Sequence, residues 1–346
     1  MAMAEVTVMG AGIFGLSVAY ACARAGARVQ VIDPHGVGAG SSGGLVGALS
    51  PHTPENWNPK KAFQLESLLM AEGYWAAIAD LTGLSAGYGR VGRLQAIDTP
   101  RALELAQARA GGAATLWQGR AEWNVVPAGQ FAGWAPEAAT GYLIHDTLSA
   151  RMHPRRACAA LAAAIRELGG RIDTDATPRG SVVWATGHRG LLELSKALAK
   201  PVGNGVKGQA LLLDHDAAGA PQIYADGLHI IPHADGTVAI GSTSERDFDA
   251  PDTTDAQLDA LLVRAARILP ALQGAQVLER WAGVRPRAKS RAPMLGAWPG
   301  RPGHFIANGG FKIGFGIAPK VGAVMADLVL QGVDAIPDGF RVEDNL

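Results

Sequence analysis

The hydrophobic pattern at the start of the chain predicts a strand, a helix and a second strand. Residues 6–33 begin with an apolar run, pass through a glycine-rich turn and continue with apolar positions at helical spacing from about Ile13. A second apolar run follows and ends in Asp33. This order is typical of a βαβ unit, in which two parallel strands are joined by a helix that packs on the sheet.

The rest of the chain mixes predicted helices and strands. Helical periodicity is expected over 60–82, 101–110, 153–170 with its end at Gly169 and Gly170, 253–272 with Thr254 or Asp255 as cap, and 316–332. Short apolar runs predict strands at 92–98, 141–146, 181–187, 208–214 and 304–310, and a hairpin over 229–243 with Asp235–Gly236 at its turn. This alternation favours an α/β fold.

Three glycines and one acid in the first unit point to a dinucleotide site. Gly10, Gly12 and Gly15 allow a tight turn, close approach of the backbone to a pyrophosphate, and tight packing of helix on strand. Asp33 follows Gly15 by 18 residues, close to the spacing of about 20 residues for an acid that binds a ribose hydroxyl. A GxGxxG pattern alone is weak, but its combination with both strands, the helix and the acid predicts a bound dinucleotide.

Two further segments favour FAD over NAD. Residues 34–52 are rich in glycine and serine but too apolar for a linker, as expected of a backbone that presses against a flat ligand. Residues 306–319 place four glycines before a helix, whose N-terminus suits an electron-rich group such as a reduced flavin. We therefore predict a Rossmann-like FAD-binding domain of the α/β class with an inserted α+β substrate domain on a mixed or antiparallel sheet. The expected bounds are 1–75, 147–200 and 281–346 for the FAD-binding domain and 76–146 and 201–280 for the substrate domain.

Composition narrows the functional classes. The 346 residues are 48% hydrophobic and 18% charged, with 31 Lys and Arg against 31 Asp and Glu, so no net field favours nucleic acid or an anionic membrane. The first strand begins too early to leave room for a cleavable leader, and no apolar run is long enough to cross a membrane. Cys22 and Cys158 lie in helical patterns without metal or disulfide spacing. We expect a cytoplasmic protein with no metal.

The ordered motifs carry a family resemblance over nearly the whole chain. GAGIFG and VID, then SSGGLVGALSP, VVWATG, WAGVRP and GGFKIGFGIAP, together resemble the FAD-dependent amino-acid oxidases of the glycine oxidase and D-amino-acid oxidase type. The resemblance implies a two-domain flavoprotein that moves a hydride from the Cα–N unit of an amine to FAD. It also implies non-covalent FAD, because related sarcosine oxidases attach flavin through a cysteine near the C-terminal segment, where this chain has none.

The resemblance assigns candidate catalytic and substrate residues. Arg285 matches the arginine that binds the substrate carboxylate in these oxidases, and a guanidinium can donate two parallel hydrogen bonds to a carboxylate. His229 stands where glycine oxidases have a tyrosine, and as a ligand it would add a pH dependence near its usual pKa of about 6.5. Lys312 stands beside the expected flavin, and His52 lies in a loop that would line the pocket. Structural or surface roles remain open for all four.

The expected cofactor contacts come from the same motifs. They are Gly10, Gly12, Ile13, Phe14, Gly15, Asp33, Pro34, Ser41, Ser42, Gly43, Gly44, Leu45, Ala185, Thr186, Gly187, Arg285, Gly309, Gly310, Lys312, Ile313 and Gly314.

The sequence leaves several functions open. The leading interpretation is an FAD-dependent oxidoreductase acting on a small amino acid or N-alkyl amino acid, with O2 or an electron carrier as the final acceptor. The alternatives are a flavin domain that oxidises a modified tRNA nucleoside, which the zero net charge disfavours, a non-catalytic flavoprotein, and an NAD-dependent dehydrogenase. We expect a small-molecule partner and neither membrane nor nucleic acid, and leave a homo-oligomer open.

Overall fold

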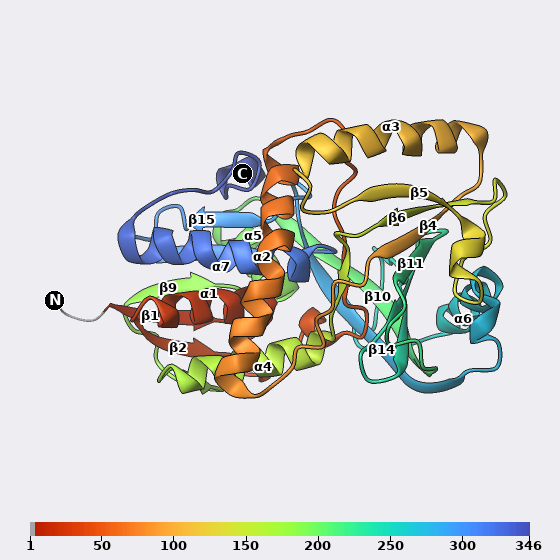
Figure 1. The fold of residues 1–346 in the computed structure, drawn as a ribbon. Helices are drawn as coiled ribbons and strands as arrows, with labels where there is room; N and C mark the ends of the chain where they lie inside the picture. The colour runs from red at the N-terminus through yellow and green to blue at the C-terminus, as the bar shows by residue number, and fades with distance from the viewer. Residues whose placement is uncertain (1–3) are drawn as a thin grey trace.

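Two large β-sheets organise residues 4–346, the part of the chain that the computed structural model describes (Figure 1). The first sheet has six strands in the order β15 (Met294–Ala297), β16 (His304–Asn308), β9 (Ser181–Trp184), β1 (Glu5–Met9), β2 (Arg28–Ile32) and β8 (Arg171–Asp173). The second has eight, in the order β14 (Gln276–Ala288), β10 (Gly203–Asp214), β13 (Thr237–Gly241), β12 (Leu228–Pro232), β11 (Gln222–Ala225), β4 (Arg93–Ile97), β6 (Tyr142–Asp146) and β5 (Trp123–Pro127). A short pair, β3 (Ala48–Leu49) and β7 (Ala150–Arg151), forms a third sheet.

The six-stranded sheet is parallel around β1 and carries the predicted βαβ unit. Strand β1 pairs in parallel with β2 and with β9, and helix α1 (Ile13–Arg24) connects the first two strands. Helix α7 (Gly314–Gln331) packs alongside α1, and α2 (Pro59–Thr82) and α4 (Pro154–Glu167) complete this side of the molecule (Figure 1). The alternating β1 and β2 side chains and the apolar faces of these helices form one large core.

The eight-stranded sheet is mixed and has two different faces. One face presents leucine, isoleucine and valine side chains that pack against helix α6 (Gln257–Ile268). Since successive side chains of a strand point to opposite faces, the intervening residues form the other face, which includes arginine, glutamine, histidine and tryptophan. Helices α3 (Pro100–Leu116) and α5 (Gly187–Ala197) complete the fold. The mixed α/β architecture confirms the fold class predicted from the sequence, whereas the domain bounds remain a prediction.

The predicted elements exist, but several bounds differ. The strand expected over 181–187 ends at Trp184, because Gly187 has a φ of +63° and begins α5. The helices expected at 101–110 and 316–332 run over Pro100–Leu116 and Gly314–Gln331. Helix α6 begins at Gln257, whose N–H is accepted by Asp255 Oδ1 at 2.9 Å. The sequence predicted only residues 208–214 of β10 and did not predict β14. The glycines, proline and arginines of these segments are not typical of a strand.

No helix within residues 4–346 combines the length and hydropathy that crossing a membrane requires. The same residues contain no group of three His, Cys, Asp or Glu side chains placed to hold a metal ion.

One buried ion pair links two strands of the larger sheet. Arg93 on β4 lies opposite Asp146 on β6, and Arg93 Nε donates to Asp146 Oδ2 at 2.9 Å. The two side chains are 9% and 0% exposed. Asp146 Oδ1 also accepts the Ser149 N–H at 2.8 Å. Removing one partner of such a pair leaves an uncompensated buried charge, which is more costly than losing the attraction itself.

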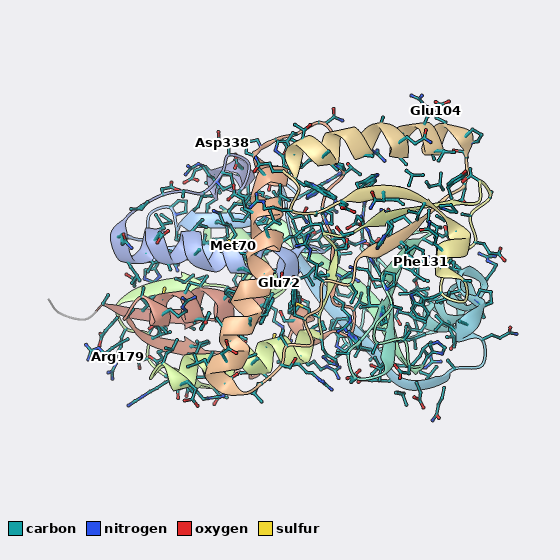
Figure 2. All side chains as sticks on the ribbon, in the orientation of Figure 1. Met70, Glu72, Glu104, Phe131, Arg179 and Asp338 are labelled. Atoms are coloured by element: carbon teal, nitrogen blue, oxygen red, sulfur yellow. The ribbon has the colours of Figure 1, made fainter. Side chains whose placement is uncertain are left out.

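We therefore expect Asp146→Ala to lower the free energy of unfolding by about 3–5 kcal/mol, because Arg93 loses its partner. Urea denaturation measures the change. Glu104→Ala is the control, since the Arg101–Glu104 pair on α3 is 85% and 67% exposed and Glu104 projects outward (Figure 2). Equal effects of the two substitutions would contradict the importance of the buried pair.

Candidate functional site

The N-termini of two long helices meet beside the glycine-rich turns. Helices α1 and α7 both begin without a side-chain cap and without an acid in their first turn. A Cβ atom on Gly310 would lie 2.8 Å from Phe14 Cζ, and one on Gly314 would lie 3.7 Å from Ile13 Cγ2. The first N–H groups of each helix lack intrahelical partners and carry partial positive charge. Their convergence therefore favours an anionic or electron-rich ligand.

The first glycine turn requires the absence of side chains. Gly10 has a φ of +106°, and a Cβ atom there would lie 2.4 Å from Ala185 O. A Cβ atom on Gly15 would lie 1.9 Å from Gly10 O. Any other residue at these positions would displace α1 from the strands β1 and β9. The turn thus exposes backbone at the carboxyl ends of parallel strands, where open α/β sheets bind nucleotides.

Polar groups that the sequence assigns to the cofactor hold this turn. Asp33 Oδ2 accepts the Ala11 N–H at 2.8 Å, and Oδ1 accepts the His35 N–H at 2.9 Å. Ser42 Oγ accepts the Ile13 N–H, the first of α1, at 3.0 Å. Strand β2 and the segment around Ser42 are therefore tied directly to the start of α1. This arrangement of glycine turn, acid and helix N-terminus fits the pyrophosphate and ribose of a dinucleotide.

The structure brings other predicted cofactor residues to the same place. The Ala185 N–H donates to Met9 O at 2.8 Å, which places the segment after β9 beside the first turn. Ser41 to Gly43 form a short 3-10 helix, and a Cβ atom on Gly44 would lie 3.2 Å from Trp281 of β14. The Leu45 carbonyl lies 3.0 Å from His233 Nε2. These contacts connect residues 41–45 to the eight-stranded sheet.

Arg285 is partly buried at the face of the eight-stranded sheet that contacts residues 41–45. Its Nη2 donates to Ser242 Oγ and, at 3.3 Å, to Thr243 O, whereas Nη1 is buried without a hydrogen-bond partner among residues 4–346. A Cβ atom on Gly208 would lie 1.8 Å from Nη2, so the guanidinium crosses the sheet over this glycine. Burial lowers the pKa of Arg285 to about 10, which still leaves it charged at neutral pH.

The pairing of strands places His229 on the same face as Arg285. His229 lies opposite Gly241, which lies opposite Ala210, which in turn lies opposite Trp281. Directly opposed residues share a face, and Arg285 is four positions beyond Trp281 on β14. The guanidinium reaches Ser242, the neighbour of Gly241. Two predicted site residues from distant parts of the sequence thus approach each other.

His229 is a neutral group among cations. Burial, together with Arg93, Lys312 and Arg285, lowers its pKa to about 3, and its Nδ1 is buried without a partner among the described residues. Its ring lies 4.7 Å from that of Tyr224 on β11. The sequence-based expectation of titration near pH 6.5 was therefore wrong, because it took no account of burial and of charges from three other segments.

Lys312 lies on the turn before α7. The preceding residue, Phe311, donates its N–H to Pro286 O at 3.1 Å, which fixes the turn to β14 next to Arg285. Lys312 Nζ lies 5.7 Å from the centre of the Phe311 ring. Partial burial, Arg285 and Arg287 lower the pKa of Lys312, and within residues 4–346 it forms no ion pair.

Not every sequence-based expectation corresponds to an observed contact. His52 is exposed, and its N–H donates to Gln64 Oε1 at 2.8 Å rather than contacting Arg285 or His229. The two parallel hydrogen bonds expected from Arg285 cannot both come from Nη1 and Nη2 in this arrangement, because Nη2 already donates to two acceptors. Sequence analysis also missed Gly208, Ser242 and Thr243. The position of Ser242 and Thr243 at the end of the predicted hairpin is the only sequence feature that could have indicated these two residues.

Comparison with known proteins gives consistent findings. Residues 5–328 match the model of the family described as DAO, FAD dependent oxidoreductase. The chain is similar to a glycine oxidase of Pseudomonas aeruginosa, with 28% identity over 96% of each chain, and to one of Bacillus licheniformis, with 26% identity over 94% of this chain and 93% of the other. Its fold resembles the crystal structure of glycine oxidase from Geobacillus kaustophilus, with a TM-score of 0.83, 21% identity and coverage of 98% and 99%.

The pKa of His229 predicts part of the acid sensitivity of the fold. An unfolded histidine has a pKa of about 6.5, so between this value and the folded value of about 3 the unfolded chain binds one more proton. Stability therefore falls as the pH is lowered through this range, by up to about 1.4 kcal/mol per pH unit for this residue. In His229→Gln, the free energy of unfolding should depend less steeply on pH between about 6.5 and 4. The difference in slope should correspond to about one proton fewer taken up on unfolding.

Chemical denaturation at several pH values measures this slope. Tyr224→Phe keeps His229 and its neighbouring ring and serves as the control, with the slope of the unsubstituted protein. An unchanged slope in His229→Gln would show that His229 titrates alike in the folded and unfolded chains.

Proposed function

Because the chain belongs to the DAO family of FAD-dependent oxidoreductases, we propose that it oxidises the Cα–N bond of a small amino acid or N-alkyl amino acid to an imine. Water then hydrolyses the imine. The observation that carries this proposal is the partly buried Arg285, whose Nη1 is buried without a hydrogen-bond partner and which has no carboxylate in ion-pair contact among residues 4–346. A buried charge without a partner is unfavourable, and a substrate carboxylate would supply that partner.

The other residues of this face have roles in orienting the amine. Arg285 Nη1 donates to the carboxylate and thereby fixes the position of the Cα–H bond. Neutral His229 offers an unpartnered Nδ1 to an N–H of the substrate. Lys312 adds positive charge beside the start of α7, which favours negative charge there. The chemistry that FAD supplies when bound is the acceptance of a hydride from carbon.

FAD binding involves the residues around both helix N-termini in this proposal. The backbone from Gly10 to Gly15 would hold the pyrophosphate, Asp33 would bind the ribose, and the turn from Gly309 to Gly314 would hold the ring system. The similarity to glycine oxidases supports a small amino acid as substrate. O2 or an electron carrier takes up the electrons afterwards.

We propose that FAD is held without a covalent bond. Cys22 and Cys158 are both buried, and burial raises the pKa of each thiol to about 12. The thiolate is the reactive form of cysteine, so both side chains are poor nucleophiles at neutral pH. Cys158 Sγ faces the Ser42 carbonyl at 3.8 Å, beneath the turn rather than at an open surface.

Anaerobic titration of the purified protein with glycine, sarcosine, D-amino acids and L-proline tests the proposed function. We expect one of these classes to bleach the visible flavin bands, because a bound amine would reduce the cofactor. Dithionite serves as the positive control for a reducible flavin. A flavin that dithionite bleaches but no amine does would contradict the proposal and favour a larger substrate or a non-catalytic role.

Arg285→Ala should leave the flavin spectrum intact and lower kcat/KM for the amino acid by about 30-fold to several thousand-fold, since loss of one partner of a buried charge pair typically costs about 2–5 kcal/mol. Steady-state kinetics measure the loss. Arg280→Ala is the matched control on the same strand, because Arg280 pairs with Asp259 and its side chain is 42% exposed. Wild-type turnover by Arg285→Ala would remove Arg285 from the site.

A further inference from the structure

A short segment after β13 holds Arg285 in place. Ser242–Glu245 runs beside β10, where Lys207 and Glu245 exchange two backbone hydrogen bonds of 2.9 Å and the Thr243 N–H donates to Gln209 O at 3.2 Å. From this segment come both acceptors of Arg285 Nη2, the Ser242 hydroxyl and the Thr243 carbonyl. The direction of the guanidinium therefore depends on where this backbone lies.

A buried polar network anchors the segment from the opposite face of the sheet. Lys207 Nζ lies 3.5 Å from Glu245 Oε2, and the two side chains are only 5% and 12% exposed. Glu245 Oε1 accepts from Thr243 Oγ1 at 2.5 Å and from Gln209 Nε2 at 3.0 Å. Lys207 lies opposite Val284 and Arg285 lies opposite Val206, so the network and the guanidinium are on different faces.

The hydrogen bonds of this network have only one consistent direction. The Gln209 N–H donates to Thr243 Oγ1 at 2.8 Å, so the single hydroxyl proton of Thr243 is left for Glu245. Glu245 Oε1 is then the acceptor of the Thr243 hydroxyl. Burial alone would raise its pKa, but the hydrogen bonds from Thr243 and Gln209 and the Lys207 ammonium lower it below its ordinary value. The Thr243 side chain is thus held in a single orientation.

We propose that Thr243 and Glu245 are positioning residues that aim the Arg285 guanidinium at the substrate carboxylate. This inference rests on the proposed function, because it takes Arg285 as the carboxylate anchor. With Thr243 fixed by Glu245, its carbonyl and the adjacent Ser242 hydroxyl bind both protons of Nη2, and Nη1 alone turns to the ligand. Neither Thr243 Oγ1 nor Glu245 forms a hydrogen bond or an ion pair with Arg285 within residues 4–346. Thr243 therefore acts through the backbone of the segment, and Glu245 acts through Thr243 and through its negative charge near the guanidinium.

Thr243→Val tests the inference in the FAD-loaded protein, with acetate as the probe because it is a carboxylate that has no amine to oxidise. Its dissociation constant is read from the perturbation of the flavin spectrum. We expect binding to weaken by about tenfold or more, within the range of measured couplings between contacting residues. Thr243→Ser, which keeps the hydroxyl, should restore it. For the amino acid, KM should rise more than kcat falls.

Thr237→Val is the matched control, since its hydroxyl donates to Asp235 in the hairpin turn and not to this network. Acetate affinity should stay at the wild-type value in this variant. A second test, independent of Thr243, combines Glu245→Ala with Lys207→Met. This double variant removes both buried charges and the acceptor of the Thr243 hydroxyl, so we expect acetate affinity to fall by about tenfold or more.

The outcomes separate this inference from the proposed function. If Arg285→Ala loses acetate binding but Thr243→Val keeps it, the positioning role is overturned and the carboxylate anchor stands. If Arg285→Ala itself binds acetate normally, the anchor of the proposed function fails. Should Thr243→Val not fold, acetate affinity within about threefold of wild type in the double variant would overturn positioning by the hydrogen bond, because that bond is absent there.

Discussion

The close approach of two helix N-termini across side-chain-free turns is the constraint on which the rest of the structure depends. Helices α1 and α7 pack in parallel, and Gly10, Gly15 and Gly310 leave no room for a Cβ atom at their starts. Each helix directs the positive end of its dipole at one place. Two segments far apart in the sequence, the starts of α1 and α7, thereby lie side by side at a position suited to an anionic cofactor. The segments between them in the sequence form the rest of the site.

The pleat of the eight-stranded sheet divides its chemistry between two faces. Side chains such as Leu211 and Ile230 bind α6, and the alternate positions carry Arg285 and His229 toward the cofactor segment. A shift of one residue in register would exchange these faces and bury the charges among leucines. The apolar packing on α6 therefore does more than stabilise the sheet, since it also determines which side chains face the ligand.

Sequence reasoning succeeded where the determinants are local and failed where they are not. The turn at Gly10 and the acid at Asp33 lie within one βαβ unit, so the glycine pattern, the two strands, the helix and the acid together predicted a nucleotide site. Ser242 meets Arg285 across 43 positions and only through the pairing of β13, β10 and β14, which no local pattern encodes. Strand β14 was missed because its glycine, proline and arginine lower strand propensity, and burial between neighbours overrides that preference.

The cations of the site act together on one neutral group. Arg285, Lys312 and Arg93 all lower the pKa of His229, so the same charges that attract a carboxylate keep the imidazole unprotonated. In the proposed function, a carboxylate bound at Arg285 would offset part of this positive field and thereby raise the proton affinity of His229. Linkage makes the effect reciprocal, since a proton on His229 then favours the carboxylate. Because the folded pKa of His229 is about 3, this coupling would act in acid and not near neutral pH.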